Sequence, residues 1–319
     1  MGLPYDAGVA NYLSPKYHSR IKHDGTWRWV DQLSVKSGGS WRTVKQAWVK
    51  SGGSWRKWHD AENLFTFSVE LSGTRTSTFN LSNWLSSSGY VSPSLGRTYN
   101  SGDRIRGIIH VTGTQGGNPG INIGNFGSES RVYIRINSNC RIAGYGGNGS
   151  GLDSNGNGGG TALYTRTPVY IENNGNMWAG GGGGVGGTNG QCVGVYYYNY
   201  NCGKNCYAQG TGYNYNPAQG GGGGGGAGVP NGSGASPNGN NGSYNSGGNG
   251  GAGNGCGSAK GGRGGDPGNN GGPSTFENGS THRNGGTTGY YIDGASYVYS
   301  WIATGDRRGR SGNEWNNQN

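Results

Sequence analysis

The chain of 319 residues has few of the side chains from which globular proteins build their cores. Only 30% of its residues are hydrophobic and 13% are charged, and it has 10 prolines and 2 methionines. A large apolar core is therefore excluded for much of the chain, and collagen, which needs abundant proline, is excluded as well. No apolar run is long enough to cross a membrane, and no signal peptide is recognisable at the N-terminus. We therefore expect a protein that is made in a cytoplasm without a signal peptide.

Patterns that carry catalysis are also missing. The acidic residues between positions 144 and 289 are few and isolated, whereas a glycosidase needs paired carboxylates. No nucleophile, phosphate-loop or zinc-protease motif is present. The sequence therefore predicts no enzyme and no cofactor.

Cysteine is scarce and unevenly spaced. The five cysteines are an odd number, so they cannot all pair with one another, and the chain is not a disulfide scaffold. Cys192, Cys202 and Cys206 have no histidine near them, so we expect no metal site. Whether these three form a disulfide stays open at this point.

Glycine, in contrast, is abundant and concentrated. Of 74 glycines, 52 lie between Gly144 and Gly289, and Gly220–Gly226 is an unbroken run of seven. A flexible linker would need no strand-like ALYTRTPVYIE segment, and an RNA-binding arm would repeat GGRGG, which occurs once. Glycine also recurs at a spacing of three, as in Gly262, Gly265 and Gly268. This spacing predicts packed polyglycine II rods, in which extended helices bond to one another through backbone groups that no side chain blocks.

Three copies of a 14-residue unit lie near the N-terminus. They read IKHDGTWRWV, VKSGGSWRTV and VKSGGSWRKW, and each has an Asp-Gly or Gly-Gly pair between β-prone residues. This is the strongest short-range signal for a β-hairpin, because both turn positions need a positive φ. We expect three hairpins in which the lysine of each copy lies opposite its tryptophan. These pairs are Lys22 with Trp27, Lys36 with Trp41 and Lys50 with Trp55.

The two faces of each hairpin differ in character. One carries tryptophan and lysine; the other carries Ile21 with Val30, Val35 with Val44, and Val49 with Trp58. Either the tryptophans fill the middle of a small prism, or they form a docking platform on the tip of a three-fold symmetric partner. Residues 1–60 hold ten of the 25 basic residues and four of the 15 acidic ones, so a platform would suit an acidic partner.

Residues 64–142 have the pattern of a β-rich region. LFTFSVEL, RIRGIIHV and RVYIRI are short apolar or alternating runs separated by Gly, Asn and Ser, which predicts strands. NLSNWLSSSG predicts one short helix, capped by Asn80 and ended by Gly89. VYIRINSNCRIAGYGG, which begins at Val132, can be aligned with VYIENNGNMWAGGGGG, which begins at Val169, if one residue is skipped. A folded sheet therefore leads directly into the glycine-rich region.

The segment VYIENNGNMWAGGGGG, the glycine runs that follow it and the closing GYYIDGASYVYSWIATGDRRGR resemble the glycine-rich adhesins at the tail-fibre tips of T-even-like bacteriophages and related glycine-rich phage tail proteins. The resemblance covers residues 64–310 and implies a sandwich of polyglycine rods whose connecting loops form a distal, host-facing tip. The three repeats resemble short Trp/Lys/Gly repeats of phage structural proteins. The chain departs from the pattern in a long tyrosine-rich segment, which leaves the class of receptor open.

This tyrosine-rich segment, Gln191–Gln219, is the strongest candidate for recognition. Tyrosine with Asn, Ser and Gly is typical of binding loops, because tyrosine gives a large, rigid contact area with a polar tip. The alternative is that the tyrosines pack on one another over the rods. Two further loops, within residues 230–247 and 271–286, add other candidates. The predicted receptor-binding residues are Tyr196, Tyr197, Tyr198, Tyr200, Lys204, Tyr207, Tyr213, Tyr215, Tyr244, Phe276, His282 and Arg283.

Taken together, the sequence predicts an all-β and polyglycine II protein with very little helix. We expect an attachment region at 1–60, a β-rich connecting domain at 61–143, a glycine-rich domain with receptor-binding loops at 144–289 and a closing strand and tail at 290–319. The expected function is that of a tail fibre-tip or tail-tip adhesin of the virion, which binds a host outer-membrane protein or surface polysaccharide. Its expected partner is a trimeric tail fibre or tail-tip protein, bound through the N-terminal repeats, and not nucleic acid. The alternative is a non-viral glycine-rich structural or ice-binding protein.

Overall fold

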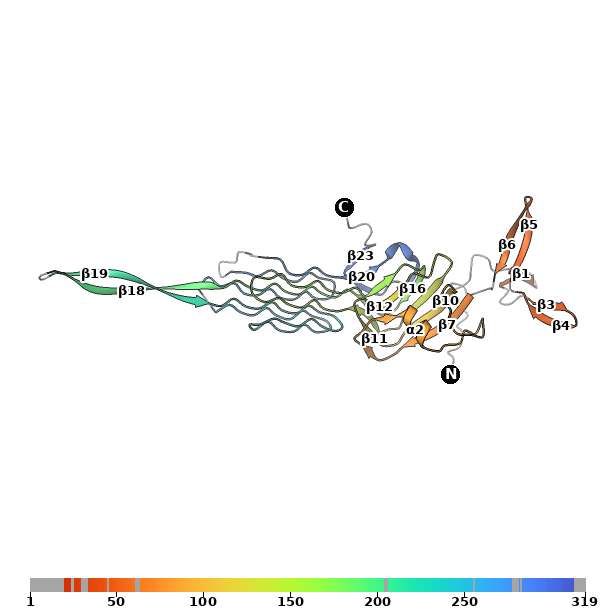
Figure 1. Ribbon diagram of the computed structural model, residues 1–319, viewed down its shortest axis with the longest axis horizontal. Helices are drawn as coiled ribbons and strands as arrows, with labels where there is room; N and C mark the ends of the chain where they lie inside the picture. The colour runs from red at the N-terminus through yellow and green to blue at the C-terminus, as the bar shows by residue number, and fades with distance from the viewer. Residues whose placement is uncertain are drawn as a thin grey trace.

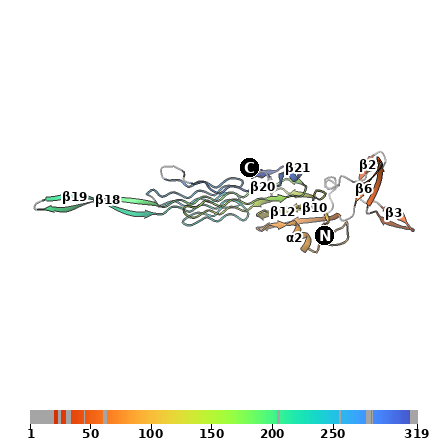
Figure 2. The same ribbon diagram turned by 45° about the horizontal axis from the view of Figure 1, so that its top comes forward.

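The computed structural model describes residues 20–23, 26–29, 34–44, 46–60, 64–203, 206–254, 256–276, 281 and 283–312. The molecule is elongated (Figure 1). Three small hairpins lie at one end, followed by a parallel β-structure, an array of extended glycine-rich segments and one long hairpin at the other end. A second view has the same order (Figure 2). The two ends of the molecule are therefore formed by different kinds of hairpin, which the glycine-rich array and the β-structure hold apart.

The N-terminal repeats form three separate antiparallel hairpins, as predicted. Their registers set Lys22 opposite Trp27, Lys36 opposite Trp41 and Lys50 opposite Trp55, which confirms the predicted pairing. The second face is more polar than expected, because Arg42 lies directly opposite Val35 and Arg56 opposite Val49. Val30, expected on this face, lies outside the described residues. The strands are β1 (Arg20–His23), β2 (Thr26–Trp29), β3 (Ser34–Ser37), β4 (Ser40–Thr43), β5 (Gln46–Ser51) and β6 (Ser54–Asp60).

The middle and C-terminal parts of the chain together form three parallel sheets of five strands each. The first contains β7 (Leu64–Leu71), β10 (Arg104–Val111), β13 (Arg131–Ile136), β16 (Val169–Asn173) and β21 (Val298–Ala303). The second contains β8 (Thr74–Arg75), β11 (Thr114–Gly117), β14 (Arg141–Gly144), β17 (Asn176–Trp178) and β22 (Asp306–Arg308). The third contains β9 (Phe79–Asn80), β12 (Ile121–Gly124), β15 (Leu163–Thr165), β20 (Tyr290–Asp293) and β23 (Arg310–Gly312), and a 3-10 turn η1 (Ala295–Tyr297) precedes β21.

The chain visits these sheets in the same order five times, which is the topology of a parallel β-solenoid. The predicted strands LFTFSVEL, RIRGIIHV and RVYIRI are β7, β10 and β13. The two segments that align in sequence stack directly, with Val132 beside Val169. The four domain ranges stay a prediction, although residues from both sides of the glycine-rich region share all three sheets.

The core of the solenoid follows from the two-residue period of its strands. Alternate residues of β7 point inward, and their neighbours continue the same columns through the sheet. One such column consists of Ile109, Ile134 and Ile171, all fully buried and paired in register. Stacked identical side chains give a continuous apolar core from short strands, so this part of the chain needs few apolar residues per pass.

A short helix and the segment after it cover the first pass. α2 (Leu81–Ser87) is the only α-helix among the described residues. The Asn80 side chain accepts a hydrogen bond from the Asn83 amide at 3.0 Å, as expected of an N-cap, and Gly89 has a φ of 67°. Leu81 and Leu85 are buried in the solenoid core. The predicted helix is thus confirmed at both ends, and it closes an edge that would otherwise expose the core.

The glycine-rich segments leave the solenoid from one corner, between its second and third sheets. The chain departs after β14 and returns at β15, then departs after β17 and returns at β20. Two segments of this region are completely buried: rod A (residues 180–187), which leads away from the solenoid, and rod B (residues 220–228), which leads back toward it. The run of seven glycines is the greater part of rod B, so the run forms the interior of the array.

Hydrogen bonds from rod A follow a period of three residues. Its amide groups donate in turn to three neighbouring segments. The amides of Gly180, Gly183 and Gly186 donate to the carbonyls of Gly160, Asn157 and Ser154, respectively. The amides of Gly181, Gly184 and Gly187 donate to the carbonyls of Ala227, Gly224 and Gly221. The amides of Gly182 and Val185 donate to the carbonyls of Asn269 and Gly272. Its carbonyls accept from three further segments, within residues 147–153, 259–265 and 286–289. Rod A therefore has six hydrogen-bonded neighbours.

Rod B is surrounded in the same way. It donates to residues 147–150, 237–243 and 259–265, and it accepts from rod A and from residues 232–235 and 248–251. The neighbours approach so closely that a Cβ added at Gly221 would lie 1.8 Å from the carbonyl oxygen of Gly251. Glycine is required here because the backbone of a neighbouring segment occupies the space that a side chain would need.

Candidate functional site

A long antiparallel ribbon extends from the end of the glycine-rich array that is opposite the solenoid (Figure 1). Its strands are β18 (Gly190–Gly203) and β19 (Cys206–Ala218). Rod A leads into β18, and β19 leads into rod B, so the ribbon prolongs the two buried rods beyond the array. The composition of this segment is typical of binding loops, whereas the segment forms two long paired strands. Glycine interrupts both strands, but their many aromatic and β-branched residues favour a strand.

One face of the ribbon carries a row of three tyrosines, which we call the tyrosine ladder: Tyr196, Tyr198 and Tyr200. Adjacent ring centroids are 6.1 Å apart in both steps, with interplanar angles of 41° and 44°. Directly across the ribbon lie Gly212, Gly210 and Ala208. The rings therefore lie opposite the smallest side chains available, which leaves room for them to extend across the neighbouring strand.

The opposite face of the ribbon has a different composition. Here Val193 pairs with Tyr215, Val195 pairs with Tyr213, and Tyr197 lies opposite Thr211. These five valine and tyrosine side chains are all exposed. The ribbon thus presents an aromatic row on one side and a mixed aliphatic and aromatic surface on the other. This much exposed apolar surface on one element is typical of an interaction site.

A disulfide bond fixes the base of the ribbon to the array. Cys192, near the start of β18, is bonded to Cys256, which follows the residue 248–254 segment of the array. Cys202, near the tip, is also disulfide-bonded, and Cys140 is a free cysteine in the solenoid. The sequence left open whether Cys192, Cys202 and Cys206 form a disulfide among themselves. The partner of Cys192 is 64 residues away, outside the tyrosine-rich segment, so Cys192 is not part of such a bond.

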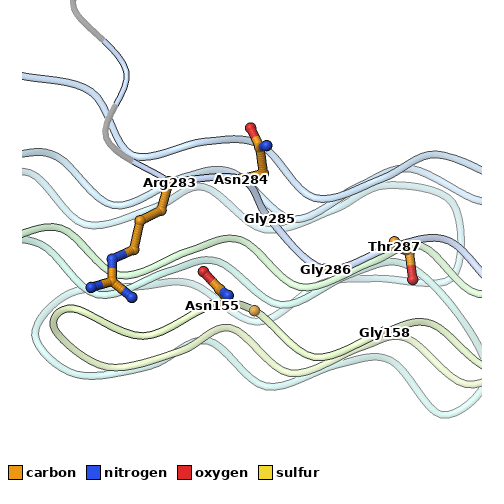
Figure 3. A pocket seen from close by; sticks show the side chains of 8 residues that line it. Asn155, Gly158, Arg283, Asn284, Gly285, Gly286 and Thr287 are labelled. Carbon is orange, nitrogen blue, oxygen red and sulfur yellow. The ribbon is translucent and has the colours of Figure 1, made fainter.

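A polar groove lies on the flank of the array, between the segments around residues 155–158 and 283–287. It has a volume of about 560 Å³. The side chains of Arg283 and Asn155 point toward each other at one end of it, and Thr287 lies at the other (Figure 3). Gly156 and Gly285 form part of its wall, so a ligand could approach the backbone. The groove offers hydrogen-bond donors and one positive charge.

The hairpins at the other end of the molecule expose their tryptophans. Trp41 is 72% exposed and Trp55 is 66% exposed, and each lies beside its paired lysine on a hairpin that forms its own sheet. The side chains of Lys22 and Trp27 lie outside the described atoms. Side chains this exposed are not packed in a core. In the described part of a single chain, Trp41 and Trp55 therefore do not fill the middle of a small prism, which was one of the two arrangements considered from the sequence.

The most strongly coupled ionisable groups lie on the solenoid, away from both ends. Tyr133 and Arg135 both donate hydrogen bonds to Glu172, the latter at 2.7 Å. Burial is the largest single influence on Glu172 and opposes its ionisation, but the hydrogen bonds from Tyr133, Arg135 and Asn174, together with the charge of Arg135, lower the pKa of the carboxyl group overall. Burial, and then the hydrogen bond to Glu172, raise the pKa of Tyr133. Arg135 and Glu172 therefore form an ion pair that is kept at neutral pH, and none of these three groups titrates near neutral pH.

Residues 66–312 match the family model of the phage tail fibre adhesin Gp38. The chain belongs to this family. A solved structure, that of the gp37-gp38 adhesin tip complex of the bacteriophage S16 long tail fiber, is similar to the adhesin at 24% identity and a TM-score of 0.45, over 76% of this chain and 80% of that one. A comparison with curated proteins gives no match. Membership in a phage adhesin family replaces the alternative of a non-viral structural or ice-binding protein.

The adhesin brings most of the predicted receptor-binding residues together on the ribbon. Tyr196, Tyr197, Tyr198, Tyr200, Tyr213 and Tyr215 are all exposed there. Tyr207 also lies in β19, but its side chain, Lys204 and His282 lie outside what the structure describes. Phe276 and Arg283 belong to the array and not to the ribbon. The ladder tyrosines do pack on one another, as the alternative has it, but the ribbon carries the six described side chains beyond the array and not over the rods (Figure 1).

Tyr244 does not join this group. It lies in the turn that contains Asn245, whose side chain accepts a hydrogen bond from Arg141 of β14 at 3.1 Å. This turn therefore lies at the solenoid end of the array, at the opposite end from the ribbon. The sequence could not assign it, because a glycine-rich chain that runs back and forth gives no sign of which turns share an end.

Two features of the site escaped the sequence interpretation. The first is Cys256, which closes the disulfide to Cys192 from a distant turn. The second is the pair Gly210 and Gly212, whose positions opposite Tyr198 and Tyr196 create the ladder. A signal for the second was present: GTGYNYN alternates with a period of two, which is typical of a strand.

Proposed function

We propose that this phage tail fibre adhesin attaches to a fibre through its N-terminal hairpins and binds a receptor on the host cell surface through the ribbon. The observation that carries the proposal is that the exposed aromatic side chains belong to two kinds of hairpin, and these hairpins lie at opposite ends of an elongated molecule (Figures 1 and 2). One end is available to the virion, and the other then points toward the host.

The proposed attachment surface consists of the paired lysines and tryptophans of the hairpins. Three near-equal units suit a partner with three-fold symmetry, in which each hairpin meets one subunit. The excess of basic residues in the first 60 positions suits an acidic partner surface. The partner we propose is a trimeric tail fibre or tail-tip protein. The proposed contact residues are Lys22, Trp27, Lys36, Trp41, Lys50 and Trp55.

We further propose that the rods are polyglycine II helices and act as a rigid spacer. The support is the three-residue period of the hydrogen bonds of rod A and rod B and the six neighbours of each. The backbone hydrogen bonds of rod A and rod B leave neither rod a free surface, which supports recognition by the ribbon and the turns beside it.

The proposed receptor-binding residues are the exposed tyrosines of the ribbon, with Phe276 and Arg283 as contacts from the array. Arg283 lines the polar groove with Asn155, and this groove suits a polar or acidic group of the receptor. Tyr207, Lys204 and His282 stay predicted from the sequence alone. A few central tyrosines should carry most of the binding energy, since interfaces depend on a small number of aromatic anchors.

The test is adsorption to host cells by phage that carry an altered adhesin. Replacement of residues 191–217 by a short Asn-Gly turn should abolish adsorption and leave the adhesin on the virion. Replacement of Trp41 and Trp55 by alanine should remove the adhesin from the virion. Unchanged adsorption without the ribbon would place recognition elsewhere and overturn the proposal.

A further inference from the structure

The tyrosine ladder has a geometry that the other tyrosines of the ribbon do not share. Each of its first two rings occupies the space above a glycine of the opposite strand. A Cβ at Gly212 would lie 2.4 Å from Cζ of Tyr196, and a Cβ at Gly210 would lie 2.6 Å from Cζ of Tyr198. The rings thus rest against the backbone of β19, because no side chain there keeps them away.

A ring that rests against the backbone presents its other surface to solvent. Tyr196, Tyr198 and Tyr200 are 46%, 48% and 48% exposed, so about half of each side chain is accessible. The three rings follow one another along β18 at equal steps of 6.1 Å. They form a shallow aromatic strip that follows the strand, and a strip of this kind fits a ligand that repeats flat, ring-shaped units along its length.

The two strands that carry the ladder contain no charged residue. Residues 190–203 and 206–218 include no Asp, Glu, Lys or Arg. The polar groups on the ladder face are the tyrosine hydroxyls and, at its base, the amides of Asn214 and Asn216, which lie opposite Gly194 and Cys192. Hydroxyls and amides can both donate and accept hydrogen bonds, so they match a ligand rich in hydroxyl groups. A charged ligand would find no partner of opposite charge on either strand.

We propose that the tyrosine ladder binds a neutral polysaccharide of the host surface, with consecutive sugar rings stacked on Tyr196, Tyr198 and Tyr200. The apolar faces of pyranose rings supply the flat surfaces, and their hydroxyl groups bond the asparagine amides. This inference rests on the proposed function and gives its receptor a chemical class. The valine-containing face of the ribbon, which lacks the row of rings, takes no part in it.

The experiment compares three probes with the intact adhesin. They are whole host cells, delipidated neutral O-polysaccharide purified from host lipopolysaccharide, and host outer-membrane proteins in phosphatidylcholine vesicles. We expect the polysaccharide to bind the adhesin and to compete with cells. Binding of the adhesin only to the protein vesicles would overturn the inference. Failure of the intact adhesin to bind cells at all would overturn the proposed function, and the inference with it.

Variants on the two faces of the ribbon separate an effect at the ladder from a general effect of altering the ribbon. Tyr198→Ala should weaken polysaccharide binding on the order of tenfold, whereas Tyr198→Phe should keep most of it, because the ring supplies the stacking. Gly210→Val should weaken it as strongly as Tyr198→Ala, because the new side chain displaces the ring. Val195→Ala, on the opposite face and outside the proposed receptor-binding residues, is the control and should change nothing. Equal losses for Tyr198→Ala and Val195→Ala would contradict the assignment.

Discussion

A Cβ atom added to Gly184 would lie 1.9 Å from the carbonyl oxygen of Gly262. No rotamer change can relieve this overlap, because both contacting groups belong to the backbone of buried segments. We expect Gly184→Ala to destabilise the array by at least the ~1–3 kcal/mol typical of overpacking. The measurement is thermal or denaturant unfolding.

Gly151→Ala is the matched control for this change. Gly151 lies in the same glycine-rich region and has no atom within 4 Å of the position of an added Cβ. Its unfolding midpoint should equal that of the wild type. If the two variants were equally stable, close packing of the rods would not be the reason for their glycine content.

The second prediction concerns the exposed tryptophans. Replacement of Trp41 and Trp55 by alanine should leave the unfolding temperature within error of the wild type, because both side chains are mostly exposed. The same double variant should fail to assemble onto virions, as measured by immunoblotting of purified particles. Tyr299→Ala, another exposed aromatic residue but on the solenoid, should assemble normally. A marked loss of stability in the tryptophan variant would show that these side chains belong to a core.

The third prediction concerns the disulfide at the base of the ribbon. Replacement of both Cys192 and Cys256 by serine removes a link across 64 residues, and links of this kind contribute ~2–4 kcal/mol. We expect faster amide exchange in the lower part of β18 and weaker binding to host cells. Cys140→Ser, which removes the free thiol, should leave both quantities unchanged. Equal binding by the disulfide variant and the wild type would mean that the base of the ribbon needs no link.

The fourth prediction concerns pH. Arg97 donates two hydrogen bonds of 2.7 Å to the carboxylate of Asp103, and these, with the Asn100 amide, hold the pKa of Asp103 below its ordinary value. The resulting stabilisation is complete above the unfolded-state pKa of about 3.9, and it is lost as the pH falls through the lower, folded-state pKa. Asp103→Asn should therefore lower the unfolding temperature at pH 7. The difference from the wild type should shrink as the pH falls below the unfolded-state pKa of about 3.9 and through the lower folded-state pKa.

Glu129→Gln is the control for this titration. Glu129 pairs with Arg104 at 3.0 Å, but its side chain is 62% exposed, and exposed pairs contribute little. The unfolding temperature of the Glu129→Gln variant should follow that of the wild type over the whole pH range measured. A difference for Asp103→Asn that stayed constant with pH would indicate a packing effect and not the ion pair.

The local signals in the sequence predicted the hairpins, the helix and the strands of the solenoid, because each depends on neighbouring residues. The Asp-Gly and Gly-Gly turns fixed the pairing of lysine with tryptophan, and Asn80 marked the start of α2. The order of the sheets could not be predicted in this way. The segments that complete the last passes are separated by the whole glycine-rich region, and nothing local indicates that β20 pairs beside β15.

The candidate site was predicted in composition but not in shape. The tyrosines of the ribbon were identified because tyrosine is concentrated there, whereas the division of these tyrosines between two faces depends on the cross-strand register. Tyr244 was grouped with them on composition alone, although it lies at the solenoid end of the array. Which ends of a folded-back chain coincide is decided by the packing of whole rods, and glycine runs carry no information about it.

The orientation of the rods has a mechanical consequence for an adsorbed particle. They run along the long axis of the molecule, and their hydrogen bonds join neighbours sideways (Figure 1). A pull between the ribbon and the N-terminal hairpins is therefore carried along covalent backbone, while the sideways bonds are loaded together in shear. Rod A and rod B, which hold the ribbon, cannot slide out of the array unless the bonds to all their neighbours break at nearly the same moment. An array without a large apolar core can in this way hold a tether under tension.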